Sequence, residues 1–342
     1  MLHIETHGSW RQMGEQYGEA ARSLIHKAIQ YFAPWSLRDG ARAAKAASFV
    51  RTSVGREFPE LIEESEGMAR SAGVNPDAML VLRFLPDLSA AAQLHCSVVF
   101  LNDSDRGPVL ARNEDIEPDV SVEIQVCRTA RPSEGPATVL LTYVSFVAGV
   151  VMNEHGLAVG GTSAHATGAE SSQGGKPNSI AFHVLSNRCR RVGDISRELS
   201  HRRFAGKGCV AIVGDATGDS SLLEFLPGLP PVITPRPRDR DWQACTNNYI
   251  TSIDRVFIDP PYLCIGYARY GRILHKLSDN PMARTIENVQ RLLGDVAMPG
   301  PCVPAAGLKL NTAYSTVMLL RDRRLLLADG HPAKAEFQEF AL

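Results

Sequence analysis

The spacing of apolar residues divides the chain into two parts that meet near residue 95. In the first part, apolar side chains recur every three or four positions at Trp10, Met13, Tyr17, Ala21, Leu24, Ala28 and Tyr31. This spacing predicts one face of a long amphipathic helix. Further helices are predicted over Arg42–Val54, after Pro59 and over Ala78–Leu85. Asn75-Pro76-Asp77 is a typical helix start before the last of them. The first 95 residues are therefore expected to be helical.

After Cys96 the pattern changes to short runs of strand-forming residues between turns. We predict strands at Ser97–Leu101, Val109–Asn113, Val122–Arg128, Thr138–Val144, Gly149–Asn153, Leu157–Gly161, Gly208–Gly214, Ser221–Phe225, Ser315–Leu320 and Arg324–Leu327. Helices are predicted at Ile180–Arg188, Val192–Phe204, Tyr267–Leu277 and Ala283–Leu293. The Pro- and Arg-rich stretch Pro230–Asp241 is expected to be an exposed loop. Hairpins interleaved with helix pairs favour an α/β fold in which two antiparallel sheets lie between helical layers.

Composition narrows the function classes. The chain has 342 residues, 44% of them hydrophobic, and 36 Lys and Arg residues against 37 Asp and Glu residues. This balance gives no basic surface for nucleic acid. No apolar run approaches the roughly 18 residues of a membrane span. The sequence starts without a basic segment followed by an apolar one, and its seven cysteines form no CxxC pair. We therefore expect a cytoplasmic protein with reduced thiols.

Sequence motifs for a bound cofactor or metal are missing. No Gly-rich nucleotide fingerprint follows a predicted strand, and the ten histidines show no HExxH and no paired ligand spacing. We therefore expect a protein that works without cofactor or metal.

Cys96 opens the first predicted strand, and two charged residues follow it in the next predicted strand. A single cysteine in a strand is most often a small buried residue. However, Arg112 and Asp115 stand 16 and 19 positions further on, in a strand that a hairpin pairs with the strand of Cys96. Side chains on paired strands can lie close together. These three residues are therefore candidates for a nucleophilic site.

The pattern resembles the cysteine N-terminal-nucleophile (Ntn) hydrolases. In one branch, the choloylglycine hydrolases with penicillin V acylase, an Arg and an Asp follow the nucleophile at this spacing. Asn153 lies in a stretch similar to that branch's N-E-x-G-L turn, and Asn247 in a Thr-Asn dipeptide like that branch's own. Arg269 lies in a segment that resembles S-R-F-x-R, although Ala268 replaces the Ser.

The second branch, the acyl-CoA:6-aminopenicillanate acyltransferase-like enzymes, is similar in its N-terminal part. Its propeptide begins with a glycine-bearing helix, which Gly8, Gly14 and Gly18 resemble. That branch has Gly before the nucleophile, whereas this chain has His95. The resemblance implies a four-layer αββα sandwich. It also implies that the chain cuts itself between His95 and Cys96, into a helical propeptide or α-chain (1–95) and a catalytic β-chain (96–342). The two chains would stay together as one compact domain.

The resemblance also implies a role for each site residue. Cys96 would be the nucleophile, and its freed α-amine, with an ordinary pKa of about 7.7–8.0, would be the base. Asp115 would hold that amine and Arg112 would favour the thiolate. Asn153 and Asn247 would stabilise the oxyanion. Arg269 would orient Asp115 or bind a substrate carboxylate.

The implied reaction cleaves or transfers the acyl group of a non-peptide amide or acyl thioester, such as acyl-CoA, through a thioester on Cys96. The sequence leaves open whether water or an amine accepts the acyl group. Tyr143, Phe146 and Val147 would line an acyl pocket or belong to the core. The substrate is a small N-acyl molecule, and a homo-oligomer is expected.

Two alternatives remain open. One is a papain-like Cys–His hydrolase without self-cleavage, in which His155, His165 or His275 would supply the base. The other is an inert protein on the same fold, in which Cys96 is buried and unreactive.

Overall fold

The computed structural model describes residues 1–36, 40–88, 95–116, 119–164, 175–206, 208–253, 260–279, 282–297, 299–302 and 311–342. Their N-terminal part begins with the strand β1 (Leu2–Gly8) and continues with six helices. These are α1 (Trp10–Ala20), α2 (Arg22–Ser36), α3 (Gly40–Val54), α4 (Pro59–Ala72), α5 (Pro76–Arg83) and α6 (Leu85–Leu88). The predicted cap of α5 is confirmed, because the Asn75 side chain accepts hydrogen bonds from the N–H groups of Asp77 and Ala78.

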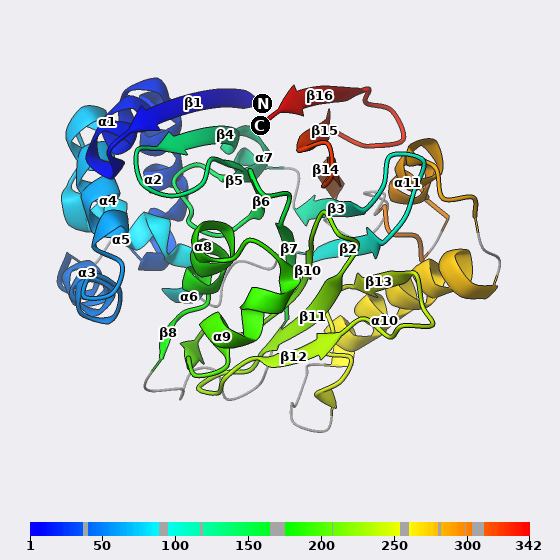
Figure 1. Cartoon of the computed structure of the whole chain (residues 1–342). Coiled ribbons are helices and arrows are strands. Elements are labelled where there is room, and N and C mark those ends of the chain that lie inside the picture. The colour runs from blue at the N-terminus through cyan, green and yellow to red at the C-terminus, as the bar shows by residue number, and fades with distance from the viewer. Residues whose placement is uncertain are drawn as a thin grey trace.

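Two large sheets form the centre of the molecule (Figure 1). The eight-stranded sheet has the order β1, β4 (Gln125–Pro132), β5 (Thr138–Tyr143), β6 (Val150–Asn153), β7 (Ala158–Ser163), β10 (Cys209–Gly214), β11 (Ser220–Phe225), β12 (Val232–Pro235). The six-stranded sheet has the order β13 (Trp242–Cys245), β2 (His95–Leu101), β3 (Val109–Ile116), β14 (Asn311–Leu319), β15 (Arg324–Asp329), β16 (Phe337–Ala341). Neighbouring strands are antiparallel, except for the parallel pair β1–β4.

Three hydrophobic cores show how the layers are stacked. One core joins the facing sides of the two sheets, with Val98 and Leu110 against Val210 and Ile212. A second lies between the outer face of the eight-stranded sheet and a helical layer that includes α8 (Ser179–Arg188) and α9 (Ile195–Leu199). A third joins the outer face of the six-stranded sheet to α10 (Pro260–Leu274) and α11 (Ile286–Leu293). The predicted four-layer αββα sandwich is therefore confirmed.

The remaining elements are short. They are the helix α7 (Val120–Glu123), a two-stranded parallel pair of β8 (Lys176–Pro177) and β9 (Phe204–Ala205), the 3-10 turn η2 (Val192–Asp194) and the π-helical turn η4 (His275–Asp279).

Glycines allow the backbones of helices α1 and α4 to pack in direct contact. A Cβ atom at Gly14 would lie 2.2 Å from the Glu64 carbonyl oxygen, one at Gly18 would lie 2.4 Å from that of Met68, and one at Gly67 would lie 2.4 Å from that of Arg11. Helices α1 and α4 therefore meet along a line where only hydrogen fits. Figure 1 shows these helices beside the edge strand β1 and its neighbour β4.

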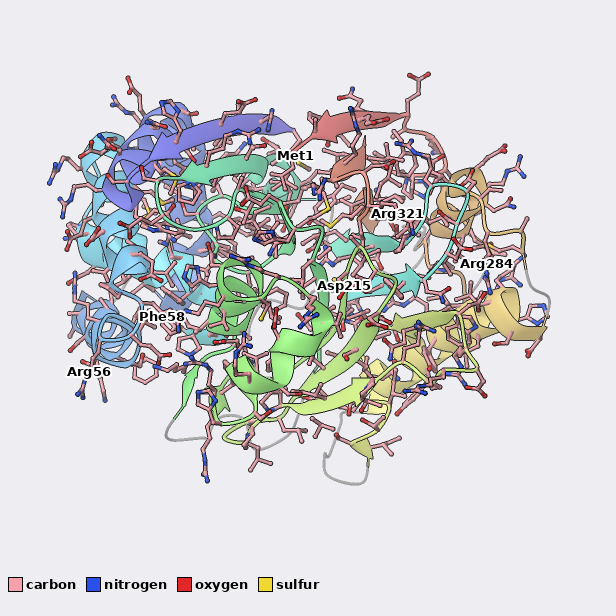
Figure 2. The ribbon with its side chains drawn as sticks, viewed as in Figure 1. Met1, Arg56, Phe58, Asp215, Arg284 and Arg321 are labelled. Carbon is pink, nitrogen blue, oxygen red and sulfur yellow. The ribbon has the colours of Figure 1, made fainter. Side chains whose placement is uncertain are left out.

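Several element predictions were wrong in detail. The chain opens with a strand, because Ile4 and Thr6 alternate with exposed side chains and pair with β4. Residues Val122 and Glu123 belong to the helical turn α7, and the predicted helix Val192–Phe204 ends at Leu199. The expected loop Pro230–Asp241 contains the edge strand β12, and β16 follows the two strands predicted to end the chain. Figure 2 labels Met1, whose amino group pairs with Asp329 of β15 at the junction of β1 with the second sheet.

Candidate active site

The predicted site lies in the middle of the six-stranded sheet, where β2 and β3 form a ladder. Cys96 is directly opposite Glu114, and His95 is opposite Asp115. Successive side chains of a strand point to opposite faces. Arg112 and Glu114 therefore share the face toward the other sheet, whereas Asp115 points to the outer face, where α10 packs. The Cys96 residue is thus reached from both sides of its strand.

On the inner face, the thiol of Cys96 lies beside an arginine and a glutamate. The Arg112 Nη2 atom donates to Cys96 Sγ at 3.0 Å and also forms an ion pair with Glu114. Arg112 is fixed further by hydrogen bonds to the Gly161 carbonyl oxygen at 2.9 Å and to the Tyr314 hydroxyl at 3.3 Å. The Cys96 thiol donates to Glu114 Oε2 at 3.8 Å. All of these side chains are buried.

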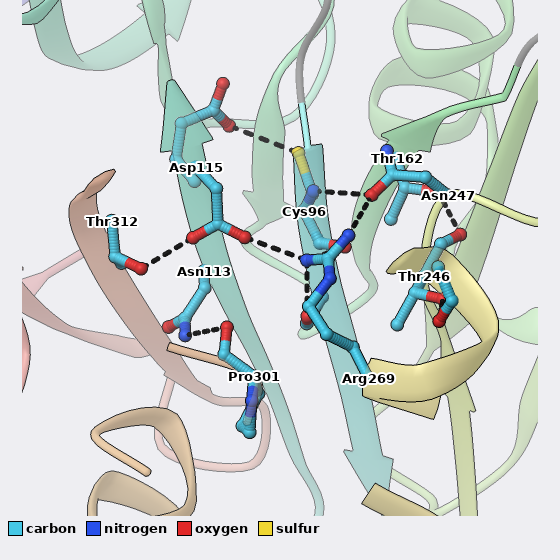
Figure 3. Close-up of polar contacts among 12 residues, drawn as sticks. Cys96, Asn113, Asp115, Thr162, Thr246, Asn247, Arg269, Pro301 and Thr312 are labelled. Atoms are coloured by element: carbon cyan, nitrogen blue, oxygen red, sulfur yellow. Dashed lines mark hydrogen bonds and ion pairs between the residues drawn. The ribbon is translucent and has the colours of Figure 1, made fainter. Parts of the chain in front are cut away.

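On the outer side, polar groups hold the backbone of Cys96 (Figure 3). The Cys96 N–H donates to Asn247 Oδ1 at 2.9 Å, and Arg269 Nη2 donates to the same oxygen at 2.5 Å. Arg269 Nη1 contacts the Cys96 carbonyl oxygen at 3.2 Å and pairs with Asp115 Oδ2 at 2.9 Å. Asp115 Oδ1 accepts the Thr312 hydroxyl at 2.6 Å. Arg269 thus joins Asp115 to Asn247.

Burial and charge set the ionisation of these groups. Burial raises the pKa of the Cys96 thiol, and the Glu114 and Asp115 charges add to this increase, whereas Arg112 and Arg269 oppose it. Burial also raises the pKa of Asp115 to about 6, although Arg269 and Thr312 favour its charged form. Cys96 is therefore a neutral thiol in this structure.

A pocket opens above the thiol, lined by residues of both sheets and of the helices α6 and α8. Its lining includes Cys96, Arg112 and Glu114 at one end, and its remaining walls are largely apolar or small. The apolar wall is formed by Pro86, Tyr143, Phe146, Ala148 and Phe182. The space within the pocket, with open solvent at its mouth included, is about 680 Å³. Of the three residues predicted for an acyl pocket or core, Tyr143 and Phe146 line this pocket, whereas Val147 does not.

The structure does not place Asn153 among the residues that contact Cys96. Its side-chain amide donates to the carbonyl oxygens of Ser186 and Cys189 at the end of α8, at 3.0 and 2.9 Å. Its Oδ1 accepts the N–H groups of His155 and Leu157 within its own turn. All of these contacts fix a turn and a helix end. Asn153 does not line the pocket that holds Cys96, where its predicted oxyanion role would place it.

The contacts of Asp115 and Asn247 differ from those that their predicted roles require. The nitrogen of Cys96 is held by Asn247, and both carboxylate oxygens of Asp115 are engaged by Arg269 and Thr312. Asp115 is linked to that nitrogen through Arg269 and then Asn247. Asn247 uses its oxygen for Cys96 and donates its amide to the Ser163 carbonyl oxygen at 2.7 Å. Arg269 pairs with Asp115, which is the contact that the first of its two predicted tasks requires.

The histidines of the Cys–His alternative lie elsewhere or outside the described residues. His275 is exposed and lies 3.6 Å from Asp279 within the turn η4. His155 lies in the turn between β6 and β7. Neither lines the pocket that holds Cys96, and His165 lies outside the described residues.

Sequence reasoning missed Glu114 and Tyr314. Glu114 stands two positions after Arg112, so strand alternation alone places both on one face. Tyr314 comes from β14, which pairs with β3 across nearly 200 residues of sequence. The signal for Glu114 was therefore present in the sequence, whereas the signal for Tyr314 was not.

Among the described residues, no three His, Cys, Asp or Glu side chains are grouped so that they could bind a metal ion. Of the helices in the described ranges, none has the length and apolarity to cross a bilayer.

An αββα sandwich of two large sheets between helical layers is the architecture of the Ntn-hydrolase class, to which this chain is related. Within this class the chain belongs to the acyl-coenzyme A:6-aminopenicillanic acid acyl-transferase family, whose model matches residues 101–325. This family relates the protein to enzymes that act on acyl groups at C–N bonds. A comparison with curated protein sequences finds no match.

Solved structures of similar shape include two from Clostridium perfringens and one from Agrobacterium tumefaciens. The first two are variants of conjugated bile acid hydrolase, each 12% identical, covering 72% of this chain and 97% of the other, with TM-scores of 0.44 and 0.47. The third is penicillin V acylase, 15% identical, covering 72% of this chain and 86% of the other, with a TM-score of 0.46.

Proposed function

We propose that this protein is an autoproteolytic Ntn amidohydrolase or acyltransferase. In this proposal it cuts its own chain between His95 and Cys96 and then transfers an acyl group through a thioester on Cys96. The observation that carries the proposal is the position of Cys96. Its thiol meets Arg112 at the end of a largely apolar pocket, while its nitrogen is held separately by Asn247.

The position of Cys96 suits both reactions. In the first, the thiol attacks the carbonyl carbon of His95, and the Cys96 nitrogen leaves as an α-amine. In the second, that amine accepts the thiol proton, and the thiolate beside Arg112 attacks the carbonyl carbon of the substrate. The hydrogen bond from the Arg112 guanidinium to sulfur stabilises the thiolate in both reactions.

The pocket indicates the substrate class. The apolar side chains Tyr143, Phe146 and Phe182 line its wall. Such a wall fits a hydrophobic acyl group, whose carbonyl carbon would lie near Cys96. We therefore propose a small N-acyl compound or an acyl thioester as the substrate, with water or an amine as the acceptor.

The two chains produced by cleavage would remain associated. Residues Leu2–Gly8 pair with Val126–Pro132 in the eight-stranded sheet, and side chains of α1, α2 and α4 belong to the core between the sheets. No part of this contact depends on the peptide bond before Cys96.

The test is the intact mass of the purified protein under denaturing conditions, compared with a Cys96→Ala variant. We expect two polypeptides from the natural sequence, the larger one beginning at Cys96, and a single chain from the variant. Cys127→Ala is the matched control, because Cys127 is also a buried strand cysteine, and it should cleave normally. The two polypeptides should co-elute under native conditions.

A natural chain that stays intact on long incubation would refute the self-cleaving mechanism. Cleavage in the Cys96→Ala variant would assign it to another agent. Release of a chromophore from N-acyl nitroanilides of increasing chain length would then measure the acyl preference of the cleaved protein.

A further inference from the structure

Glu114 is a buried carboxylate in contact with the thiol, and the proposed function gives it no task. It is 3% exposed and lies directly opposite Cys96 in the β2–β3 ladder. Its Oε2 atom accepts the Cys96 thiol at 3.8 Å and the Tyr314 hydroxyl at 3.4 Å, and it pairs with Arg112. A buried carboxylate beside a nucleophile is the usual composition of a general base site.

Self-cleavage needs a base that the uncut chain does not have at its α-nitrogen. Before cleavage the nitrogen of Cys96 is an amide, whose lone pair is delocalised and takes no proton. Burial also raises the pKa of the Cys96 thiol, which is therefore protonated. Attack on the His95 carbonyl requires that this proton be removed. The group that removes it must already be present in the uncut chain.

We propose that Glu114 is the general base of the self-cleavage step and that it accepts the thiol proton of Cys96 during attack on the His95 carbonyl. This inference rests on the proposed function. Sγ forms a bond to the carbonyl carbon, and the carbonyl electron pair moves to oxygen. The electron pair then returns, the bond from that carbon to the Cys96 nitrogen breaks, and the nitrogen receives the proton from Glu114.

The result of these steps is a thioester between His95 and Cys96 and a free α-amine, with no atom gained or lost. One water molecule then completes the cleavage. Its oxygen joins the His95 carbonyl carbon, the bond from that carbon to Sγ breaks, and the sulfur regains a proton.

The geometry favours Glu114 over Asp115, the other buried carboxylate near Cys96. Asp115 points to the opposite face of the strand, where both of its oxygens are engaged by Arg269 and Thr312. Glu114 shares the face of the thiol. Arg112 contacts both Sγ and Glu114. Its positive charge therefore stabilises the negative charge on the carboxylate before the proton moves and on the thiolate afterwards.

The experiment follows self-cleavage in time after cell-free synthesis of the full chain, by separating the products on denaturing gels. Glu114→Gln keeps the size of the side chain but cannot take the proton. We expect it to slow cleavage by at least about 100-fold, the lower range for general base catalysis. Glu114→Asp keeps the charge but withdraws the carboxylate by one C–C bond of about 1.5 Å, and should cleave at an intermediate rate.

The matched control is Glu64→Gln. Glu64 is equally buried and pairs with Arg83 and Arg128, but it does not line the pocket of Cys96. This variant should cleave at the natural rate. Added formate should restore cleavage to Glu114→Ala, because a small carboxylate can occupy the vacated space, whereas a purely structural loss would not respond.

The outcomes separate the two proposals. If the natural chain itself stays intact, the proposed function fails, and this inference fails with it. If the natural chain cleaves and both Glu114→Gln and Glu114→Asp cleave at the same rate as it does, only the role of Glu114 is overturned. If Glu114→Gln does not fold, Glu114→Ala decides, since a rate of cleavage in it that does not respond to formate would also overturn the role.

Discussion

The buried Asp115 should make the stability of the fold fall as the pH rises. Its side chain is fully buried, and burial raises its pKa from 3.8 to about 6 despite the partners Arg269 and Thr312. Between these two pH values the unfolded chain releases a proton that the folded chain keeps. At about 1.36 kcal/mol per pH unit, this difference costs the fold roughly 3 kcal/mol by the time the pH exceeds 6.

The perturbation that isolates this effect is Asp115→Asn in a Cys96→Ala background, which keeps the chain in one piece. The amide preserves the shape of the side chain and does not titrate, but it cannot neutralise Arg269. The unfolding free energies of the variant and its parent therefore differ by a constant amount plus a pH-dependent amount, which comes from the titration of Asp115. From pH 4 to pH 7 the difference in unfolding free energy should move in favour of Asn by roughly 2 kcal/mol.

The assay is urea unfolding of both proteins at unit steps of pH, with unfolding free energies extrapolated to water. A difference that stays constant across the range would show that Asp115 has the same pKa in the folded and unfolded states. A difference that moves in favour of the Asp parent would show that Arg269 outweighs burial and lowers the pKa. Either result would refute the electrostatic description of the outer side of the site.

Three further predictions concern packing and the support of the site. Gly18→Ala should destabilise the fold by about 1–3 kcal/mol in thermal unfolding, because its Cβ would meet the Met68 carbonyl oxygen, whereas the helical control Gly271→Ala has open space and should be neutral or slightly stabilising. Arg269→Met leaves Asp115 without its buried counter-charge and should cost about 3–5 kcal/mol in urea unfolding at pH 7; a loss below about 1 kcal/mol would contradict the pairing. Asn153→Ala should lose roughly 2–3 kcal/mol of stability and still self-cleave at the natural rate in the gel assay; slow cleavage in a well-folded variant would restore Asn153 to the site.

The local sequence pattern was sufficient to predict the part of the site that lies in the β2–β3 hairpin. The turn between the strands of Cys96 and Arg112 fixes their register, so the predicted proximity of the two side chains is found in the structure. The same alternation separates Arg112 from Asp115, since three positions on a strand change the face. Proximity of both to Cys96 was predicted, but the opposite sides they occupy were not.

Long-range pairing explains what the sequence did not predict. The strand β1 joins its sheet through β4, which is far away in the chain, whereas β16 is added at an edge of its sheet beside β15. Asn153 lies in a turn whose neighbours, the carbonyl groups at the end of α8, follow it by more than 30 residues. A turn motif alone does not show which groups will surround it, and in this fold they are a helix end.

The position of Cys96 on a central strand gives the proposed chemistry a physical basis. In self-cleavage one residue must supply both the nucleophile, its sulfur, and the leaving group, its nitrogen. The strand turns the Cys96 side chain to the inner face, and its pairing with β13 ends at Val98, so the Cys96 N–H is left for the side chain of Asn247. Here Arg112 and Glu114 contact the sulfur from the inner face, and Asn247 and Arg269 hold the backbone from the outer side. The two sets of charges can therefore act on sulfur and nitrogen independently, which a cysteine in an exposed loop or on a helix surface would not allow.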